Sequence, residues 1–209
     1  MVRAIIFDVD GVLLDNAPQV LKAFQGTARE LGVRVPPEHE IRSLFGQPWW
    51  IVLAKLFGHE PDDNARQTYL KIWRGLEPEM HITDGADDVL SELELPMAIV
   101  TSKQKQTLQR QLGKILKHFK ALITADDQTP GKYKPDPDPI WLACKRLSVE
   151  PKNSIYVGDA LNDFKAASMA GTAFVGFLGG GATAEEFKKA GVKHIATSME
   201  ELAKMIREI

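Results

Sequence analysis

Residues 4–11 read Ala-Ile-Ile-Phe-Asp-Val-Asp-Gly, and this stretch decides the fold. Four apolar residues in succession are typical of a strand that is covered on both faces, as in a parallel sheet. The strand is followed by Asp8 and Asp10, and Gly11 then allows a sharp turn. Ligands of open α/β sheets bind beyond the carboxyl ends of the strands, so both aspartates lie where chemistry is expected. Two carboxylates that face one pocket repel each other unless they share a cation or a proton. The stretch therefore predicts a divalent metal beside a nucleophile and an acid/base group, and the alternative is a pair of solvated turn aspartates.

Composition excludes several classes of protein. The chain has 209 residues, enough for one large domain or for a domain with an insert. Its formal net charge of −2 gives no reason to expect nucleic acid or an anionic membrane as a partner. No apolar run approaches the ~20 residues of a membrane span. The single cysteine, Cys144, cannot form an intrachain disulfide, and we expect a buried thiol in a cytoplasmic protein.

The chain divides into two kinds of sequence. Residues 16–82 carry helical periodicity without a strand pattern, and Asn16 and Pro18 are expected to begin the first helix as its N-cap and first-turn proline. This block predicts an all-helical cap domain inserted after the first strand. The remainder, residues 1–15 and 83–209, predicts an α/β core with a doubly wound parallel sheet.

Strands and helices alternate in the second part, which favours right-handed βαβ crossovers. We expect one of its helices to begin with Asp138 as N-cap and Pro139 at its first position. The expected strands cover residues 97–100, 121–124, 154–157, 173–177 and 194–196, and the other expected helices cover 84–94, 104–117, 161–170, 183–190 and 199–208.

Polar residues gather at one edge of the predicted sheet. Thr101 and Ser102 follow the second strand, Asp159 follows the fourth, and Asp163 lies one turn into the next helix. Lys134 comes from the loop before another helix. Mg²⁺ prefers oxygen ligands, and a transferring phosphoryl group needs positive charge and hydrogen-bond donors around its oxygens. This set of residues therefore predicts Mg²⁺-assisted phosphoryl transfer.

Four segments resemble, in order, the four motifs of the haloacid dehalogenase superfamily. The helical insert resembles the cap of the first subfamily, and the tail from Gly176 to Leu202 is similar to phosphoglycolate-phosphatase-like members. The sequence departs from the family pattern at Val9, where phenylalanine is common. The four segments are Asp8-Val9-Asp10-Gly11-Val12, Thr101-Ser102, Lys134-Pro135 and Gly158-Asp159-Ala160-Leu161-Asn162-Asp163.

The resemblance implies a role for each aspartate. Asp8 would attack phosphorus and become an aspartyl phosphate. Asp10 would protonate the leaving alkoxide and then activate water, and its backbone carbonyl would join the metal ligands. Asp159 would be the second carboxylate ligand of Mg²⁺, with Asp163 supporting the metal site from behind it.

The resemblance also implies roles for the polar groups around the phosphate. Thr101 and the Ser102 amide would hold phosphate oxygens, while Lys134 would neutralise charge on Asp8 and the phosphoryl group. Thr101 and Ser102 could instead only cap the helix that follows. Lys132 competes with Lys134, but only Lys134 precedes the proline of the family pattern.

Other polar segments have a simpler explanation. Asp126 and Asp127 end the third strand and are expected to be solvated. The run Gly179-Gly180-Gly181 lacks the spacing of a dinucleotide fingerprint, so we expect a turn.

The segment from residue 42 to residue 50 is the part of the insert that we expect to face the site. Gly46 and Pro48 interrupt the helical run there, which would let backbone amides approach a ligand. Arg42 could bind a substrate carboxylate in bidentate fashion. The alternative is a solvated Arg42 beside tryptophans that belong to the cap core.

The sequence thus predicts a Mg²⁺-dependent phosphomonoester phosphatase for a small soluble phosphate ester, with phosphoglycolate as the family-level candidate. Asp10 argues against the dehalogenases and phosphonatases of the superfamily, which lack that aspartate. A β-phosphoglucomutase-like mutase is the alternative enzyme, and a non-catalytic binding protein is the alternative of another class. The oligomeric state is left open.

Overall fold

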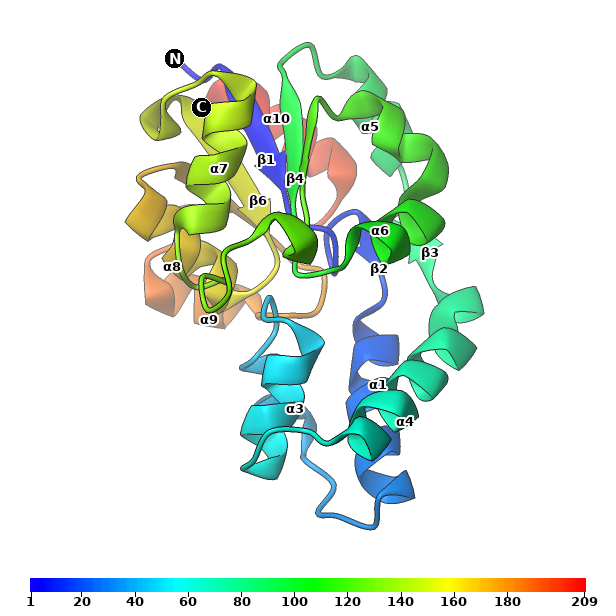
Figure 1. The fold of residues 1–209 in the computed structure, drawn as a ribbon. Helices are drawn as coiled ribbons and strands as arrows, with labels where there is room; N and C mark the ends of the chain where they lie inside the picture. Colours follow the sequence, from blue (N-terminus) through cyan, green and yellow to red (C-terminus); the bar gives the residue numbers. More distant parts are fainter.

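The computed structural model describes all 209 residues and contains a parallel six-stranded sheet with a helical unit beyond its carboxyl edge (Figure 1). The strand order is β5-β4-β1-β6-β7-β8, which confirms the predicted α/β class and the doubly wound sheet. The strands are β1 (Ala4–Phe7), β4 (Met97–Val100), β5 (Ala121–Ile123), β6 (Ser154–Gly158), β7 (Ala173–Phe177) and β8 (His194–Ala196).

Strand β1 lies at the centre of the sheet, and all four of its residues are buried. It pairs with β4 on one side and β6 on the other, so that Phe7 stands level with both Ile99 and Val157. The chain runs outward from β1 through β4 and β5, then returns to β6 and continues to the opposite edge. This reversal beside β1 is the position at which open α/β sheets bind ligands.

Two layers of helices cover the sheet, and alternate residues of β1 face each layer. Ile5 and Phe7 belong to the hydrophobic cluster that includes side chains of α5 (Ala86–Glu92), α6 (Lys105–Leu112) and α10 (Met199–Glu208). Ile6 belongs to the opposite cluster, which includes side chains of α7 (Asp138–Leu147), α8 (Leu161–Ala170) and α9 (Ala184–Ala190). The unbroken apolar run is explained by burial on both faces. The short 3₁₀ helices are η1 (Glu77–Glu79), η2 (Gly113–His118), η3 (Ala125–Asp127) and η4 (Pro151–Asn153).

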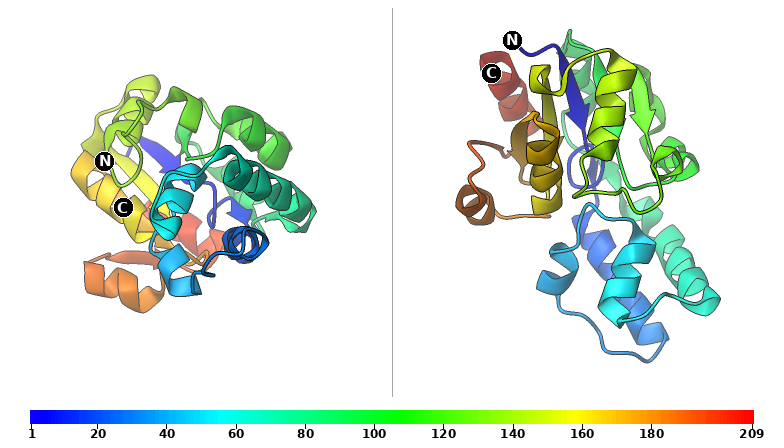
Figure 2. Two further views of the ribbon diagram at one scale, coloured as in Figure 1. Left: turned by 60° about the horizontal axis from the view of Figure 1, so that its bottom comes forward. Right: turned by 60° about the vertical axis from the view of Figure 1, so that its left-hand side comes forward.

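The helical insert comprises α1 (Ala17–Glu30), α2 (Glu38–Arg42), α3 (Trp49–Phe57) and α4 (Asp63–Leu76). The right-hand view in Figure 2 shows these helices together beyond the strand ends. They enclose a hydrophobic cluster of their own, in which Phe24 and Trp49 pack on Tyr69. The Asp62 side chain caps α4 by accepting a hydrogen bond from the Ala65 amide at 2.8 Å.

The prediction that residues 16–82 contain no strand is wrong at the C-terminal end of this range. Strand β3 (His81–Ile82) pairs antiparallel with β2 (Leu14–Asp15), and the Thr83 amide adds a hydrogen bond of 3.1 Å to the Leu13 carbonyl. A two-residue strand is too short to produce the alternation that identifies strands. The two chain crossings between core and insert are therefore paired with each other.

Two predicted helix starts differ from the structure in their caps. Asn16 stands at the N-cap position of α1, but its side chain makes no capping bond and donates instead to the Asp10 carboxylate. Helix α7 begins at Asp138, and Asp136 Oδ1 accepts from the Asp138 amide at 3.0 Å. In α1 the Asp10 carboxylate competes for the side chain that was expected to cap the helix. In α7 the N-cap residue is Pro137, so Asp138 is the first helical residue and Pro139 the second.

The remaining core elements agree with prediction apart from their ends. The helix expected over residues 104–117 is α-helical only to Leu112 and continues as the 3₁₀ helix η2. Cys144 is buried as expected. None of the helices is long and apolar enough to span a lipid bilayer.

Candidate active site

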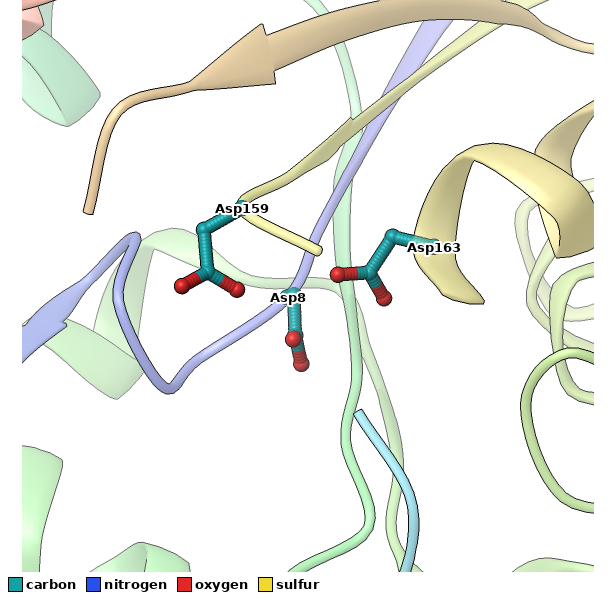
Figure 3. A group of neighbouring side chains, drawn as sticks. All are labelled: Asp8, Asp159 and Asp163. Carbon is teal, nitrogen blue, oxygen red and sulfur yellow. The ribbon is translucent and has the colours of Figure 1, made fainter. Parts of the chain in front are cut away.

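Three buried carboxylates converge beyond the carboxyl ends of β1 and β6 (Figure 3). Asp8 directly follows β1, Asp159 directly follows β6, and Asp163 comes from the first turn of α8. A carboxylate oxygen from each lies within 4.8 Å of the others. Like charges at this separation repel strongly at a site removed from water, so the cluster requires compensating positive charge.

Lys134 supplies part of that charge. Its Nζ lies 2.9 Å from Asp8 Oδ1 and 2.7 Å from Asp163 Oδ1, and it donates to the Tyr156 hydroxyl at 3.2 Å. The side chain is almost fully buried. Lys132, the competing lysine, instead pairs with Asp136 at 3.1 Å on the surface, so only Lys134 reaches the cluster.

The buried charges shift one another's pKa values. Burial, with smaller contributions from the charges of Asp163 and Asp10, raises the pKa of Asp8 to about 7 against the opposing effect of Lys134. Burial and the neighbouring carboxylates also raise the pKa of Asp159 well above its usual value. Burial alone would lower the pKa of Lys134, but Asp163 and Asp8 outweigh it and raise that pKa. One lysine therefore does not neutralise three carboxylates.

The carboxylate cluster fits a small divalent cation. Its donors are all carboxylate oxygens, the ligands that Mg²⁺ prefers, and burial and the neighbouring carboxylates together raise the pKa values of Asp8 and Asp159. A cation bound among Asp8, Asp159 and Asp163 would favour their ionised forms.

We expect Mg²⁺ to stabilise the protein more at pH 8 than at pH 5.5. In the metal-free protein the raised pKa of Asp8 contributes stability below about pH 4, and this contribution is lost as the pH rises through about 7. Metal binds the deprotonated carboxylates, so saturating Mg²⁺ should raise Tm by about 5–10 °C at pH 8. Less than half of this rise is expected at pH 5.5, as measured by thermal unfolding in Mg²⁺ and in EDTA.

Two variants separate this effect from nonspecific salt stabilisation. Asp159→Asn removes one buried carboxylate and should lose most of the Mg²⁺-dependent rise. Asp126→Asn makes the same chemical change at an exposed position outside the cluster and should keep it. A rise that is independent of pH, or that persists in Asp159→Asn, would contradict a metal bound by this cluster.

Asp10 lies in a different environment from Asp8. Its carboxylate is about one-third exposed, and Oδ1 accepts from Lys103 Nζ at 2.7 Å and from the Asn16 side chain. Sequence reasoning missed Lys103, although this residue directly follows Thr101-Ser102. It also assigned Asn16 only to helix capping. Asp10 is thus held by two donors on the side of the helical insert.

The glycine run predicted as a turn also supports the carboxylates. The Gly181 amide donates to Asp159 Oδ2 at 2.8 Å. A Cβ atom at Gly179 would lie 1.5 Å from the Gly11 carbonyl oxygen, and one at Gly11 would lie 2.0 Å from Asp159 Oδ2. Gly11 also has a φ of +69°, a conformation that favours glycine. Close backbone packing, which no local pattern indicates, explains these glycines.

Thr101 and Ser102 follow β4 but do not cap α6, whose N-cap residue is Gln104. The Thr101 side chain is buried, and its Oγ1 accepts from the Lys103 amide at 3.2 Å. Ser102 lines the pocket above the carboxylates, and its hydroxyl donates to the Gly46 carbonyl at 2.6 Å. The structure thus places Ser102 between the core and the insert.

Of the two insert residues predicted to face the site, Gly46 lines the pocket and Arg42 does not. Gly46 has a φ of +86°, and a Cβ atom there would lie 3.6 Å from Asp163 Oδ1. The Arg42 guanidinium donates to the Gly180 carbonyl and is 3.5 Å from Glu38 Oε2. Arg42 therefore joins the insert to the glycine run, because that carbonyl lies within its reach.

Asp126 and Asp127 also lie outside the cluster. Asp126 accepts from the Lys105 amide at 2.8 Å, and Asp127 pairs with Arg146 at 2.7 Å. The expectation that they are not site residues agrees with these contacts.

The parallel sheet and the buried carboxylate–lysine cluster at its carboxyl edge define the class of protein as an α/β protein with a candidate metal site at the strand ends. Residues 5–177 match the family model described as haloacid dehalogenase-like hydrolase. The chain belongs to this family of hydrolases.

Individual relatives agree with this assignment. An N-acetylmuramic acid 6-phosphate phosphatase of Pseudomonas putida is 30% identical over 81% of this chain and 80% of its own length. A phosphoglycolate phosphatase of Nitrosospira multiformis is 31% identical over 82% of this chain and 81% of its own. The crystal structure of a hydrolase from Pseudomonas syringae has a TM-score of 0.87 at 24% identity, covering 100% of this chain and 99% of that one. The similarity to the Pseudomonas syringae structure is evidence for the fold alone.

Proposed function

We propose that this chain is a Mg²⁺-dependent phosphomonoester phosphatase that works through an aspartyl phosphate on Asp8. The observation that carries the proposal is the contrast between two aspartates two residues apart. Asp8 is buried against Lys134 and two further carboxylates, whereas Asp10 is partly exposed in the same pocket. Such a pair suits a nucleophile and a separate acid/base group.

In the first half of the proposed reaction, an Asp8 carboxylate oxygen forms a bond to phosphorus. The bond from phosphorus to the ester oxygen breaks, its electron pair stays on that oxygen, and Asp10 donates the proton that makes the free alcohol. Thr101 and the Ser102 amide are proposed to hold phosphate oxygens, and Lys134 to balance the charge on Asp8 and phosphate.

In the second half, Asp10 takes a proton from water while the water oxygen attacks phosphorus. The bond between phosphorus and Asp8 breaks, which releases inorganic phosphate and restores the carboxylate. Mg²⁺ held by Asp8, Asp159 and the Asp10 carbonyl, with Asp163 in support, would neutralise the repulsion between carboxylates and phosphate. These ligand roles are part of the proposal.

We further propose that residues 16–82 form a cap domain on a core of residues 1–15 and 83–209. The separate hydrophobic cluster of the insert and the paired crossings β2 and β3 support this division. A cap that closes over the phosphate excludes water and strengthens charge interactions beneath it.

The alternatives receive less support. A phosphosugar mutase must bind a second phosphate, but the only two lysines that line the pocket, Lys103 and Lys134, are both paired with aspartates and no arginine lines it. A binding protein has no need of a nucleophile beside an acid. Phosphoglycolate, the substrate in the names of several relatives, is the candidate suggested by the sequence.

The proposed function predicts Mg²⁺-dependent release of nitrophenol from p-nitrophenyl phosphate. Exhaustive treatment with EDTA should abolish turnover, and added Mg²⁺ should restore it, because the clustered carboxylates repel the phosphate without a cation. Turnover that survives chelation would remove the metal from the mechanism. Absence of turnover with this ester and with a panel of phosphorylated metabolites would reject the phosphatase proposal.

A further inference from the structure

A single pocket extends from the carboxylates into the helical insert, and its two ends differ in chemistry. Asp8, Asp159 and Lys134 line the end at the sheet, where the phosphate is proposed to bind. Nine hydrophobic side chains line the rest of the pocket, and all of them come from α1, α3 and α4 and the loop before α3. An alcohol attached to the phosphate would therefore occupy mainly apolar surroundings.

Aromatic rings form one wall of this apolar end. Tyr69 stacks on Trp49 with ring centroids 4.9 Å apart and an interplanar angle of 8°. It also stacks on Trp73 at 6.1 Å and 12°, while Phe24 packs at 5.0 Å from it. Neighbouring rings hold one another in place, so the wall offers a rigid apolar surface without reorganisation.

The apolar end lacks a cation that is free to bind an anion. Lys103 is the only cation that lines it, and its Nζ lies 2.7 Å from Asp10 and 4.7 Å from the centre of the Trp73 ring. Arg42 lies outside the pocket lining on the Gly180 carbonyl. A carboxylate on the leaving group would either lose hydration without a partner or compete with Asp10 for Lys103, and both are unfavourable.

The Tyr69 hydroxyl is a polar group at the apolar end that has no partner within the chain. The Tyr69 side chain is 96% buried, lines the pocket, and its hydroxyl makes no hydrogen bond within the chain. Burial and the charge of Asp10 raise the pKa of this phenol, so it remains a neutral O–H group. Because Tyr69 lines the pocket, its hydroxyl is available to bond a hydroxyl of the substrate.

We propose that this site selects phosphate esters of uncharged, ring-bearing alcohols over the carboxylated two-carbon ester phosphoglycolate. The ring of the alcohol lies along the wall formed by Trp49, Tyr69 and Trp73, and one of its hydroxyls bonds to Tyr69. This inference rests on the proposed phosphatase function and adds to it the class of leaving group. Sugars and nucleosides share the required chemistry.

The test compares kcat/KM for glucose 6-phosphate, uridine 5′-monophosphate and 2-phosphoglycolate with Mg²⁺, and p-nitrophenyl phosphate serves as the reference. All three metabolites release an alkoxide that needs a proton, so their differences report on the pocket. The kcat/KM of at least one ring-bearing ester should exceed that of 2-phosphoglycolate tenfold or more. The ester with the higher kcat/KM shows whether the preferred alcohol is a sugar or a nucleoside. A kcat/KM for 2-phosphoglycolate equal to those of both ring-bearing esters would overturn the inference. If p-nitrophenyl phosphate is still hydrolysed, the proposed phosphatase function is unaffected by that result.

Two variants test the named contacts. Tyr69→Phe should lower kcat/KM for the preferred ring-bearing ester three- to tenfold relative to p-nitrophenyl phosphate. Tyr133→Phe removes the same atom from a tyrosine that packs edge-on against Trp50 outside the pocket lining, and it should keep the wild-type ratio. Equal effects of the two variants would overturn the role of the Tyr69 hydroxyl.

Thr107→Arg places a cation on a half-buried position of α6 that lines the pocket. It should raise kcat/KM for 2-phosphoglycolate at least fivefold relative to the ring-bearing esters. An unchanged ratio in a folded variant would overturn the argument that the absence of a free cation excludes carboxylates. If the wild-type protein hydrolyses none of these esters in the presence of Mg²⁺, the proposed function is rejected and this inference with it.

Discussion

Asp8→Asn is expected to abolish turnover, lowering kcat on the order of 10⁴-fold or more. An amide has nearly the shape of a carboxylate but does not attack phosphorus. The loss should be similar for alkyl and aryl phosphates, because the missing group forms the bond to phosphorus in both cases. Steady-state phosphate release measures the effect.

The fold should tolerate this change. Asp8→Asn removes the ion pair at 2.9 Å from Lys134, but Lys134 keeps Asp163 at 2.7 Å. It also removes one of three buried carboxylates that repel each other in the metal-free protein. We therefore expect a cooperative thermal transition close to that of the wild-type protein in EDTA.

Asp126→Asn is the matched control, because Asp126 follows the edge strand β5 outside the pocket lining and the same substitution there should leave kcat unchanged. A second readout is a phosphate adduct on the peptide that contains Asp8 after rapid acid quenching of the wild-type reaction. Full activity of Asp8→Asn, with a contaminating phosphatase excluded, would eliminate the aspartyl-phosphate mechanism.

Asp10→Asn is expected to lower kcat for alkyl phosphates on the order of 10²–10⁴-fold, the usual contribution of general acid/base catalysis. The partly exposed carboxylate of Asp10 is proposed to protonate the leaving oxygen, and an amide does not. The loss should be smaller for p-nitrophenyl phosphate at the step that forms the phosphoenzyme, because its leaving group hardly needs a proton. Single-turnover kinetics with both kinds of ester separate that step from hydrolysis of the intermediate.

The phosphoenzyme provides the discriminating observation for Asp10. Without a base to activate water, Asp10→Asn should accumulate the adduct on Asp8 when p-nitrophenyl phosphate is the substrate. Equal losses on alkyl and aryl esters in the first step, or an adduct that decays at the wild-type rate, would contradict the acid/base role.

The architecture could be predicted from the sequence because it depends on local patterns. The apolar residues 4–7 required a strand buried on both faces, and the structure places this strand at the centre of the sheet. Parallel strands bring their carboxyl ends to one edge, so residues that follow adjacent strands are neighbours whatever their separation in the chain. Asp8 after β1 and Asp159 after β6 are brought together in this way, and Asp163 from α8 and Lys134 from the loop before α7 join them.

The paired crossings at the base of the insert were not predictable in the same way. Leu14 and Ile82 pair over two residues only, and such a short ladder forms because the ends of a folded insert must leave and enter the core side by side. The periodicity of either segment alone carries no such information.

The sequence by itself thus determined the fold class, the order of the elements and the residues of the carboxylate cluster. The tertiary structure decided which partners the polar residues have. Lys103 pairs with Asp10, the Gly181 amide donates to Asp159, and Arg42 donates to a carbonyl 138 residues away in the chain. It also decided that the apolar residues of the insert line the pocket as an aromatic wall. The physical reason is that burial follows from local hydrophobic pattern, whereas a hydrogen bond or an ion pair depends on the positions that packing gives to segments far apart in the chain.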